Sequence, residues 1–383
     1  MNQARPIKIM QVIARMNVGG PAVIVAELMR GLNPAKFQVV LITGFCAGDE
    51  ADYLDEVARD IPVTRINGLG RSVSAIEDIK SFFTLVRLIR KYKPDIIHTH
   101  TAKAGVLGRV AGLIAYPSAM RVHTYHGHLL HGYFTAWKTQ IVIVIEKLLA
   151  TFSAALIAIG NQVQKDLLAV RIGKFKKYTV IFPGLDKLGS QSKSSAKVEL
   201  VLEQNKTYIV FVGRLTQIKR PDRLIEIARH LKVKHPLVEL LIGGAGEKFA
   251  EIQEIAKKES LPVVFLGWRN DIGRILSASD IAVLCSDNEG IPLTLIQASQ
   301  AGLPIVSTNV GSVRDIVLNG ETGTLTEVSS YGLIHAIDDL LSNPEKMARF
   351  GQAGKERAEV LFSLQGMISA HENLYSQVIK KKL

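Results

Sequence analysis

The chain has 383 residues, of which 47% are hydrophobic and 21% are charged. The length exceeds what one ordinary core accommodates, and the composition excludes an intrinsically disordered chain. The net charge of +12 suits nucleic acid, an anionic membrane surface or phosphate-bearing substrates. Because the cations are scattered and no nucleic-acid motif accompanies them, nucleic acid is not an expected partner.

Strand-like and helical segments alternate through the N-terminal half. Apolar runs predict strands at residues 7–13, 37–43, 95–98 and 121–125, and helical spacing predicts helices at 22–32, 76–91 and 104–115. This alternation is typical of right-handed βαβ units around a parallel sheet.

The most apolar stretch, residues 140–160, is not expected to span a membrane. It carries Glu146 and Lys147 near its middle, where hydrocarbon would make both charges costly. A buried helix followed by a strand is the preferred interpretation. The start of the chain lacks the long apolar region of a signal peptide, and Cys46 and Cys285 lie in apolar strand-like runs as core thiols do. We therefore expect a cytoplasmic location.

A polar, Ser- and Lys-rich run at residues 186–203 interrupts the pattern, which then restarts. This run is the best linker candidate. We expect an α/β protein with two Rossmann-like domains, at residues 1–186 and 187–361, and a cleft between them. Ligands in such folds bind beyond the carboxyl ends of the strands, so functional residues are sought there.

A glycine pair, Gly19 and Gly20, follows the first strand and precedes a helix. Such a pair lets a backbone approach a ligand and presents amides to an anion, but a tight turn explains it equally well. It is not the G-x-G-x-x-G pattern and no suitable acidic residue follows, which disfavours a nicotinamide dehydrogenase.

The second half carries two stronger signals. Gly213 and Arg214 follow the first strand there, and Lys219 lies five residues beyond Arg214, so that both cations can reach one diphosphate. Farther on, Glu289 precedes a helix opened by glycine and proline, whose first amides suit a phosphate, and Gln297 lies two turns into that helix. The carboxylate of Glu289 is placed to accept hydrogen bonds from sugar hydroxyls.

These motifs, together with five further segments, resemble glycosyltransferase family four, the retaining enzymes of the GT-B fold. The further segments are Thr124 to Gly127, Gly243 to Gly246, Phe265 to Trp268, Ala301 to Val306, and Gly311. The resemblance spans nearly the whole chain. It implies an N-terminal acceptor domain, a C-terminal donor domain for a nucleoside diphosphate sugar (a UDP-sugar is favoured), and a final helix of about residues 362–383 that packs back on the first domain.

The resemblance also implies roles for single residues. Arg214 and Lys219 would bind the diphosphate and stabilise its departing charge, Glu289 would contact the donor sugar, and His126 would lie near the reacting carbon. The backbone at Gly267 and Trp268 would hold the base. The remaining donor-binding residues that it implies are Gly19, Gly20, Gly213, Gly290, Ile291, Pro292 and Leu293.

Gln297 departs from the family's pattern, which places a second glutamate at this position to hold the ribose hydroxyls. An amide offers one acceptor group where a carboxylate accepts two hydroxyls strongly, so we expect weaker ribose binding in an active enzyme. A catalytically inactive partner subunit that binds sugar nucleotides is the non-enzyme alternative.

The histidines of the N-terminal half invite a metal interpretation that the sequence does not favour. They are His98, His100, His123, His126, His128 and His131. No paired cysteine or carboxylate completes a zinc pattern, and no Asp-x-Asp triplet holds a metal diphosphate. We expect no metal and no cofactor. Lys103, Arg109 and the loop at residues 128–134 either recognise an acceptor or serve packing, and the sequence favours neither.

The expected reaction is transfer of a sugar, with retention at the anomeric carbon, to a hydroxyl of a saccharide or a polyprenyl-diphosphate-linked saccharide. Capsule, exopolysaccharide or lipopolysaccharide O-antigen assembly at the inner face of the cell membrane fits a basic chain of this kind. The rival enzyme is a nucleotide-sugar 2-epimerase, for which no acid–base carboxylates besides Glu289 are found.

Overall fold

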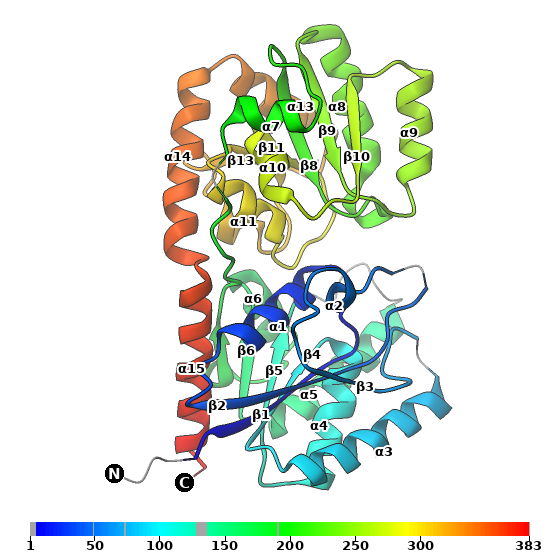
Figure 1. Cartoon of the computed structure of the whole chain (residues 1–383), viewed down its shortest axis with the longest axis vertical. Coiled ribbons are helices and arrows are strands. Elements are labelled where there is room, and N and C mark those ends of the chain that lie inside the picture. The colour runs from blue at the N-terminus through cyan, green and yellow to red at the C-terminus, as the bar shows by residue number, and fades with distance from the viewer. Residues whose placement is uncertain (1–4, 49, 73, 128–135, 190, 383) are drawn as a thin grey trace. The chain divides into compact units, whose positions relative to one another are not determined.

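The computed structural model describes residues 5–48, 50–72, 74–127, 136–189 and 191–382 (Figure 1). The chain forms two compact units, and we describe each by itself. Unit 1 contains residues 1–184 and 364–383, and unit 2 contains residues 185–363. The predicted boundaries at residues 186 and 361 lie two residues from these.

Unit 1 is built on a seven-stranded parallel sheet in the order β3-β2-β1-β4-β5-β6-β7. Its strands are β1 (Ile7–Ile13), β2 (Phe37–Thr43), β3 (Val63–Arg65), β4 (Ile96–His100), β5 (Met120–Tyr125), β6 (Ala155–Ala158) and β7 (Tyr178–Val180). The predicted strand at 95–98 extends to His100, which places both of its histidines inside the sheet.

Helices cover both faces of this sheet because successive strand residues point to opposite sides. Ile9 packs in a cluster with residues of α1 and α15, whereas its neighbour Met10 packs with residues of α3 and α4. The helices of unit 1 are α1 (Gly20–Gly31), α2 (Tyr53–Glu56), α3 (Ala75–Tyr92), α4 (Ala102–Ala115), α5 (Ala136–Phe152), α6 (Asn161–Ala169), the 3₁₀ helix η1 (Phe175–Lys177) and α15 (Leu364–Lys380). The C-terminal helix α15 thus belongs to the core of unit 1.

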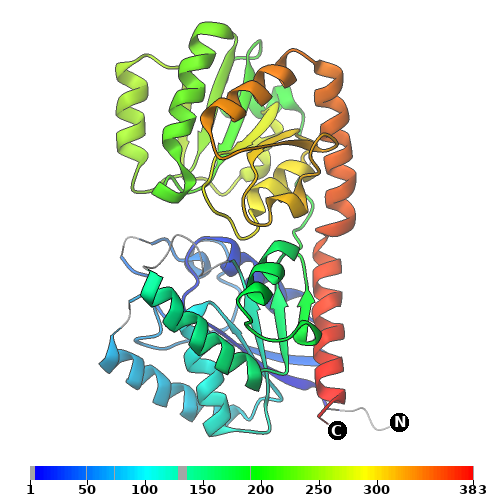
Figure 2. The ribbon, with the colours of Figure 1, turned by 180° about the vertical axis from the view of Figure 1, so that it is seen from behind.

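Unit 2 repeats the architecture with a six-stranded parallel sheet in the order β10-β9-β8-β11-β12-β13 (Figure 2). Its strands are β8 (Thr207–Val212), β9 (Val238–Gly243), β10 (Val263–Gly267), β11 (Ile281–Leu284), β12 (Ile305–Thr308) and β13 (Gly323–Thr326). Its helices are α7 (Lys193–Glu199), η2 (Gln217–Lys219), α8 (Pro221–Lys234), α9 (Phe249–Lys258), α10 (Ile272–Ser277), α11 (Leu293–Gln300), α12 (Val313–Ile316), α13 (Ser330–Leu341) and α14 (Pro344–Leu361).

The predicted linker contains a helix. The hydroxyl of Ser192 accepts a hydrogen bond from the Ser195 amide at 3.2 Å and caps α7, whose Ala196 is fully buried. The run therefore belongs to unit 2, and the chain passes between the units at Gly184 and Leu185. The polar composition concealed the capped helix.

The apolar stretch at residues 140–160 forms most of α5 and all of strand β6, as the helix-then-strand prediction has it, but α5 is not buried on all sides. Six large apolar side chains of α5 are substantially exposed: Trp137, Ile141, Val144, Ile145, Leu148 and Phe152. Within the described part of the chain, no helix has the length and apolarity that crossing a bilayer requires.

Candidate functional site

Lys219 and Glu289 form an ion pair at the carboxyl ends of β8 and β11. Lys219 Nζ lies 2.5 Å from Glu289 Oε1, which also accepts a hydrogen bond from Ser286 Oγ at 2.6 Å. The Glu289 side chain is 8% exposed and that of Lys219 is 21% exposed. Glu289 Oε2 has no hydrogen-bond partner among the described residues, so one carboxylate oxygen is left to accept further hydrogen bonds.

The loops that carry this pair are fixed to each other. The Asp287 amide donates to the Ile218 carbonyl at 2.9 Å, and the Asp287 carboxylate pairs with Arg220 and Arg223 at 3.1 and 2.8 Å. Arg223 also donates to the Cys285 carbonyl at 2.6 Å. Backbone and side-chain bonds therefore hold Lys219 and Glu289 together without help from a ligand.

Gly311 permits close packing against the backbone of Glu289. Its φ is +50°, and a Cβ at this position would lie 1.8 Å from the Glu289 carbonyl oxygen. The Ser312 amide next to it donates to the Gly290 carbonyl at 3.0 Å. Only glycine fits this approach, so the loop after β12 supports the Glu289 segment from behind.

The glycine-rich loops after β8, β9 and β10 meet at the same edge of the sheet. The Gly213 amide donates to the Gly243 carbonyl at 2.9 Å, and the Gly244 amide donates to the Gly267 carbonyl at 2.7 Å. A Cβ at Gly244 would lie 1.9 Å from the Gly213 carbonyl oxygen. Arg214, the residue after Gly213, is exposed, and its side chain makes no hydrogen bond or ion pair among the described residues. The edge thus presents a cation free to bind an anion.

Apart from Gly19 and Gly20, the other residues predicted to bind the donor lie in the same unit. Gly267 adopts φ +65° with no atom near its missing Cβ, and Trp268 beside it is 43% exposed. Pro292 is the N-cap of α11, so the predicted helix begins at Leu293. Gln297 is half-buried on α11, and its side-chain amide makes no hydrogen bond in the described part of the chain. Gly290, Ile291 and Leu293 lie in this same segment.

In unit 1, Gly19 has neither a left-handed φ nor a close contact at the Cβ position, the two structural features that ordinarily require glycine. Its φ of 163° is extended backbone that any residue adopts, and the nearest atom to an added Cβ is 3.8 Å away. The tight-turn explanation is therefore wrong for Gly19. Helix α1 begins at Gly20 and has a proline at its start. Proline lacks the backbone N–H that would have no hydrogen-bond partner in the first turn of the helix. The bare backbone at Gly19 is compatible with close approach of a ligand.

His126 follows β5 and is half-buried, and burial lowers its pKa to about 3. Its Nε2 lies 2.8 Å from His100 Nδ1, while its own Nδ1 is buried without a partner among the described residues. His98, His100 and His123 are buried in the sheet, and burial holds their pKa values well below the usual range. These imidazoles are neutral near pH 7.

The structure gives Lys103 and Arg109 packing roles. Arg109, 1% exposed, donates twice from Nη2 to the Glu146 carboxylate at 2.7 and 2.8 Å, and Tyr125 donates to the same carboxylate at 2.7 Å. Lys103 bonds the backbone carbonyls of Gly68 and Ser72. Acceptor recognition by these two cations is therefore not supported. The predicted loop at residues 128–134, with His128 and His131, lies outside the described residues.

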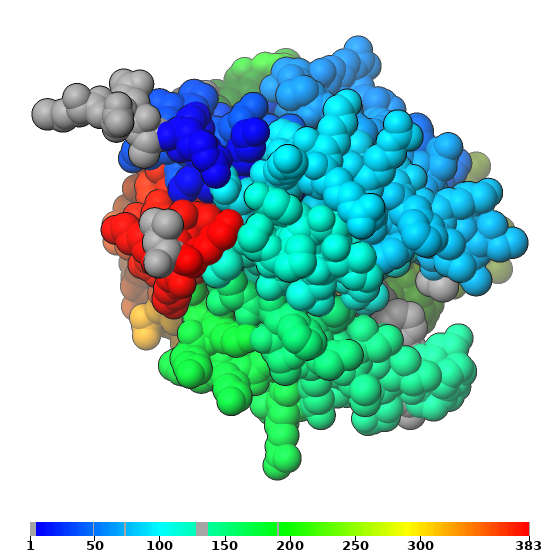
Figure 3. All heavy atoms as spheres, turned by 90° about the horizontal axis from the view of Figure 1, so that it is seen from below, coloured from blue at the N-terminus to red at the C-terminus, as the bar shows by residue number. Residues whose placement is uncertain are grey.

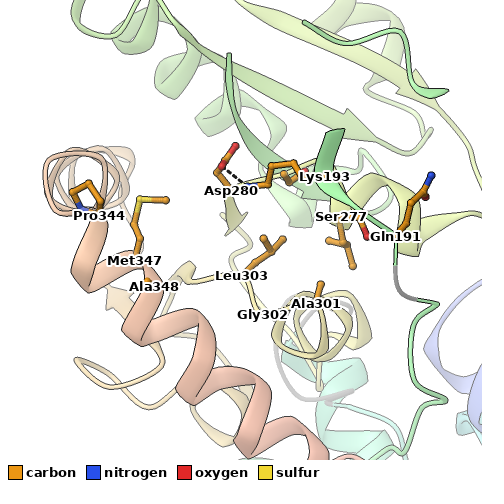
Figure 4. A pocket seen from close by; sticks show the side chains of 12 residues that line it. Gln191, Lys193, Ser277, Asp280, Ala301, Gly302, Leu303, Pro344, Met347 and Ala348 are labelled. Atoms are coloured by element: carbon orange, nitrogen blue, oxygen red, sulfur yellow. Dashed lines mark hydrogen bonds and ion pairs between the residues drawn. The ribbon is translucent and has the colours of Figure 1, made fainter. Parts of the chain in front are cut away.

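Two other features of unit 2 lie apart from these residues. In the described part of the chain, one group of three potential metal ligands has its ligand atoms within 4.8 Å of one another: His230, His235 and Asp338. Both imidazoles hydrogen-bond to that carboxylate at 2.9 Å and join α8 to α13. A shallow pocket beside α10 and α14, where Lys193 pairs with Asp280, contains no predicted site residue (Figure 4).

Comparison with known proteins identifies both halves of the chain. Residues 19–184 match the family model described as glycosyl transferase 4-like domain, and residues 192–357 match glycosyl transferases group 1. An Escherichia coli UDP-Gal:α-D-GlcNAc-diphosphoundecaprenol α-1,3-galactosyltransferase is 32% identical over 78% of this chain and 79% of its own length. The capsular polysaccharide biosynthesis glycosyltransferase CapM of Staphylococcus aureus is 26% identical over 86% of this chain and 87% of its own.

Solved structures share the fold. Anabaena HepE, crystallised with UDP, superposes with a TM-score of 0.81 at 21% identity and covers 97% of this chain and 100% of its own. Sucrose-phosphate synthase of Thermosynechococcus elongatus gives the same TM-score and identity, covering 98% of this chain and 100% of its own. Two Rossmann-like units of the GT-B type are therefore the architecture of this chain.

Proposed function

Because the chain belongs to the group 1, family-four-like glycosyltransferases of the GT-B fold, we propose that it transfers a sugar from a UDP-sugar to a polyprenyl-diphosphate-linked saccharide. The observation that carries this proposal is the Lys219–Glu289 pair at the carboxyl ends of the neighbouring strands β8 and β11, with the exposed Arg214 in the loop that follows β8. The E. coli relative, whose name specifies a UDP-sugar and a diphosphoundecaprenol acceptor, supports the choice of substrates.

In this proposal, cations stabilise the leaving diphosphate. Arg214 has its guanidinium free to bind phosphate oxygens in a planar fork, and Lys219 supplies a second positive charge. The charge that develops on the diphosphate as the glycosidic bond breaks is then met by fixed cations in unit 2. These groups can do the work for which other enzymes use a divalent metal, so we propose a reaction that needs no metal or other cofactor.

Glu289 and the surrounding loops position the donor. Its Oε1 is occupied by Lys219 and Ser286, which leaves Oε2 to accept hydrogen bonds from sugar hydroxyls. The amides at the N-terminal end of α11 are proposed to hold the phosphate, and the backbone at Gly267 and Trp268 is proposed to hold the base. Gln297 is proposed to contact the ribose with one acceptor oxygen instead of two.

We propose that transfer proceeds with retention on one face of the sugar. The bond from the anomeric carbon to the diphosphate oxygen breaks, and a bond to the acceptor oxygen forms. The acceptor's proton passes to the departing diphosphate oxygen, so no side-chain base is required. Glu289, bound to Lys219 and Ser286, contributes binding and orientation in this scheme.

The test is a transfer assay with the full chain. The protein is incubated with a synthetic polyprenyl-diphosphate-GlcNAc acceptor and one of three donors, and the masses of the products are measured by mass spectrometry. The donors are UDP-galactose, UDP-glucose and UDP-N-acetylglucosamine. The expected result is one added sugar and one equivalent of UDP, unchanged by EDTA. Conversion of the UDP-sugar without acceptor would indicate an epimerase, and donor binding without any turnover would indicate an inactive partner subunit. Loss of turnover in EDTA, restored by a divalent cation, would contradict the metal-free reaction.

We further propose that unit 1 binds an anionic membrane surface through α5. The six exposed apolar residues of α5 recur at helical spacing. The one acidic residue of α5, Glu146, is buried and forms an ion pair with Arg109. Lys138 is exposed on the same helix, and α3 adds exposed Ile76, Ile79 and Phe83. Figure 3 shows the end of unit 1 that α3 and α4 form. The apolar face of α5, with exposed Lys138 and without an exposed carboxylate of its own, is suited to anionic lipid.

Vesicle flotation tests this surface. The full chain is expected to float with vesicles that contain phosphatidylglycerol, and the floating fraction is expected to fall at high salt. With vesicles of phosphatidylcholine alone, the protein is expected to remain in the bottom fraction. An Ile141→Asn, Val144→Asn, Leu148→Asn variant is expected to lose flotation, whereas Val233→Asn, an exposed apolar change on α8, is expected to keep it. Equal flotation of all variants would contradict the assignment to α5. So would light scattering that shows a dimer which the triple variant dissociates, because a second copy would then cover this face.

A further inference from the structure

Three side chains of unit 2 bring potential metal-ligand atoms together where α8 packs against α13. His230 Nε2 lies 2.9 and 3.0 Å from the two carboxylate oxygens of Asp338, and His235 Nε2 lies 2.9 Å from the first of them, Oδ1. The three ligand atoms all lie within 4.8 Å of one another. The two histidine side chains are 22% and 25% exposed and that of Asp338 is 36% exposed, so ions in solution can reach the cluster.

The end of α8 explains how two histidines five residues apart face the same carboxylate. On an uninterrupted helix, side chains five residues apart point about 140° away from each other around the axis. Pro236 follows His235, and a residue before a proline is disfavoured in the helical conformation. His235 leaves the helix with φ −136° and ψ 71°, and its ring lies 6.0 Å from that of His230. The break in the helix therefore brings both imidazoles to Asp338.

Asp338 supplies a negative charge to the cluster. Burial alone would raise the pKa of its carboxyl group, but hydrogen bonds from His230 and His235 outweigh burial and lower that pKa. The carboxylate is therefore ionised at neutral pH and can only accept, so each imidazole presents an Nε2–H to it. In the protein alone, the cluster is a hydrogen-bonded link between α8 and α13.

The same three atoms become metal ligands once the Nε2 protons move. Neither imidazole uses Nδ1 in a hydrogen bond to a described residue, so the proton of a neutral ring can pass through water to Nδ1. That tautomer leaves the Nε2 lone pair directed at the place where the carboxylate lies. The remaining N–H then points away from the ion, as it does in metal-bound histidines that donate to water or to another polar group.

The spacing of the ligand atoms suits a small transition-metal ion. Zinc binds imidazole nitrogen and carboxylate oxygen at about 2.0–2.1 Å, so neighbouring ligand atoms around a tetrahedral ion lie about 3.3–3.4 Å apart. The Nε2–Oδ1 distances of 2.9 Å need to lengthen by only about 0.5 Å to reach that spacing. Partly exposed side chains make such a change by small rotations.

The chemistry of the ligands selects among cations. Mg²⁺ and Ca²⁺ take oxygen ligands, whereas two of the three ligand atoms here are imidazole nitrogens. Copper(II) and nickel(II) favour square-planar or tetragonal sets. Zinc has no geometric preference of electronic origin, and three protein ligands with a water molecule in the fourth position are a common zinc arrangement.

We propose that His230, His235 and Asp338 form a zinc site that fastens the end of α8 to α13. Water completes the coordination of the ion. Helix α8 begins at Pro221, two residues after Lys219, and His230 lies nine residues beyond Pro221, about 14 Å along the helix axis. The ion therefore does not contact the proposed donor, and the site is structural. The transfer reaction proposed above remains free of metal.

Calorimetric titration with ZnCl₂ tests the site. The full chain without a histidine tag is stripped with EDTA and dialysed, and MgCl₂ serves as the second probe. The wild type is expected to bind one equivalent of Zn²⁺ and no Mg²⁺. His235→Gln and Asp338→Asn are each expected to lose at least about 100-fold in zinc affinity, because loss of an outer partner alone costs about 10–100-fold. His335→Gln, an exposed change on α13, is the matched control and is expected to bind zinc like the wild type.

Two outcomes of this titration would overturn the proposal. One is a wild type that binds no zinc, which would leave the three side chains as a hydrogen-bonded link. The other is equal zinc affinity in the wild type, His235→Gln and Asp338→Asn, which would place the ion elsewhere in the chain.

Thermal melts separate the zinc site from the hydrogen bonds of the same residues. Each protein is melted with zinc and with EDTA, so the cost of a lost hydrogen bond cancels within each variant. Zinc is expected to raise the midpoint of the wild type and of His335→Gln, because binding to the folded state stabilises it. A rise of equal size in His235→Gln would overturn the proposal.

X-ray absorption at the zinc edge identifies the ligands directly. The expected shell contains nitrogen and oxygen at about 2.0–2.1 Å, with the scattering pattern of imidazole rings. Sulfur at about 2.3 Å would assign the ion to Cys46 or Cys285 and overturn the proposal. Sugar transfer, assayed well below the melting midpoint, is expected to proceed at the same rate with and without zinc. A rate that requires zinc would overturn the structural role of the ion.

Discussion

Lys219 and Glu289 are 70 residues apart in the chain, yet their side chains meet at 2.5 Å. Each follows a neighbouring strand of the unit 2 sheet, and Asp287 ties the two loops together through backbone and ion-pair bonds. The pair is therefore a product of the parallel topology, in which the carboxyl ends of β8 and β11 share one edge. It leaves one carboxylate oxygen and a nearby arginine to bind a ligand.

Neutralising Glu289 is expected to slow sugar transfer more than it destabilises the fold. Glu289→Gln keeps the shape but loses the charge that orients Lys219 and the sugar hydroxyls, so kcat should fall about 100-fold or more. Steady-state kinetics and a thermal melt on the same preparation measure both effects. Glu251→Gln, an exposed change on α9, serves as the control. A Glu289→Gln enzyme with full kcat would remove Glu289 from the reaction.

Restoring a carboxylate at position 297 is expected to tighten donor binding. Gln297 has no intramolecular partner to lose in the described structure, and a carboxylate accepts from both ribose hydroxyls. For Gln297→Glu the donor KM should fall about threefold to tenfold at unchanged kcat. The gain should vanish with a UDP-sugar analogue that lacks both ribose hydroxyls. A gain of equal size with that analogue would show that Gln297 does not face the ribose.

Removing one partner of the buried Arg109–Glu146 pair is expected to destabilise unit 1 strongly. Arg109→Met leaves the Glu146 carboxylate buried with Tyr125 as its remaining partner among the described residues, which should cost about 3–5 kcal/mol. Urea denaturation gives the difference, with the exposed Arg87→Met as the matched control. A well-folded, stable Arg109→Met protein that had lost only acceptor affinity would reverse the packing assignment of Arg109.

The buried histidines are expected to make the fold sensitive to mild acid. Burial lowers the pKa of His126 to about 3 and that of His371 to about 4, from an ordinary value of 6.5. The unfolded chain therefore binds more protons between these values, and stability present above pH 6.5 is lost as the pH falls toward 4. Each such histidine contributes a slope of up to about 1.4 kcal/mol per pH unit.

Urea denaturation between neutral pH and pH 5 measures this slope. His371→Gln should reduce it by about one histidine's share, and the exposed His335→Gln should leave it unchanged. A flat profile in the wild type would mean that these imidazoles are not held neutral by burial.

The sequence predicts the fold well because its signals are local. Helix α3 occupies residues 75–92, within one residue of the predicted 76–91 at each end, and β1 and β2 match their apolar runs. Local pattern failed where a polar run hid a capped helix, at α7, and where an apolar helix kept one face uncovered, at α5. Burial of a helix face depends on its neighbours in space, which periodicity alone does not contain.

In the candidate site too, residues at strand ends can be predicted from the sequence, whereas roles that depend on partners distant in the chain cannot. Arg214, Lys219 and Glu289 follow strands and can be found by their position at strand ends. The functions of Lys103 and Arg109 depend on partners such as Glu146, which lies 37 residues from Arg109 and is invisible to motif spacing. Among the proposed zinc ligands, His230 and His235 offered a signal, two imidazoles close together before a proline, whereas Asp338 lies 103 residues from His235 and offered none.

The most direct test of the donor site is calorimetric titration of UDP into the wild type, Arg214→Ala and Arg349→Ala. Arg349 is an exposed arginine of the same unit on α14 and serves as the matched control. UDP is expected to bind the wild type and Arg349→Ala alike, whereas Arg214→Ala is expected to lose at least tenfold in affinity, about 1.4 kcal/mol. Equal affinity in all three proteins, or no binding of UDP to the wild type, would contradict the placement of the nucleotide diphosphate at this edge of unit 2.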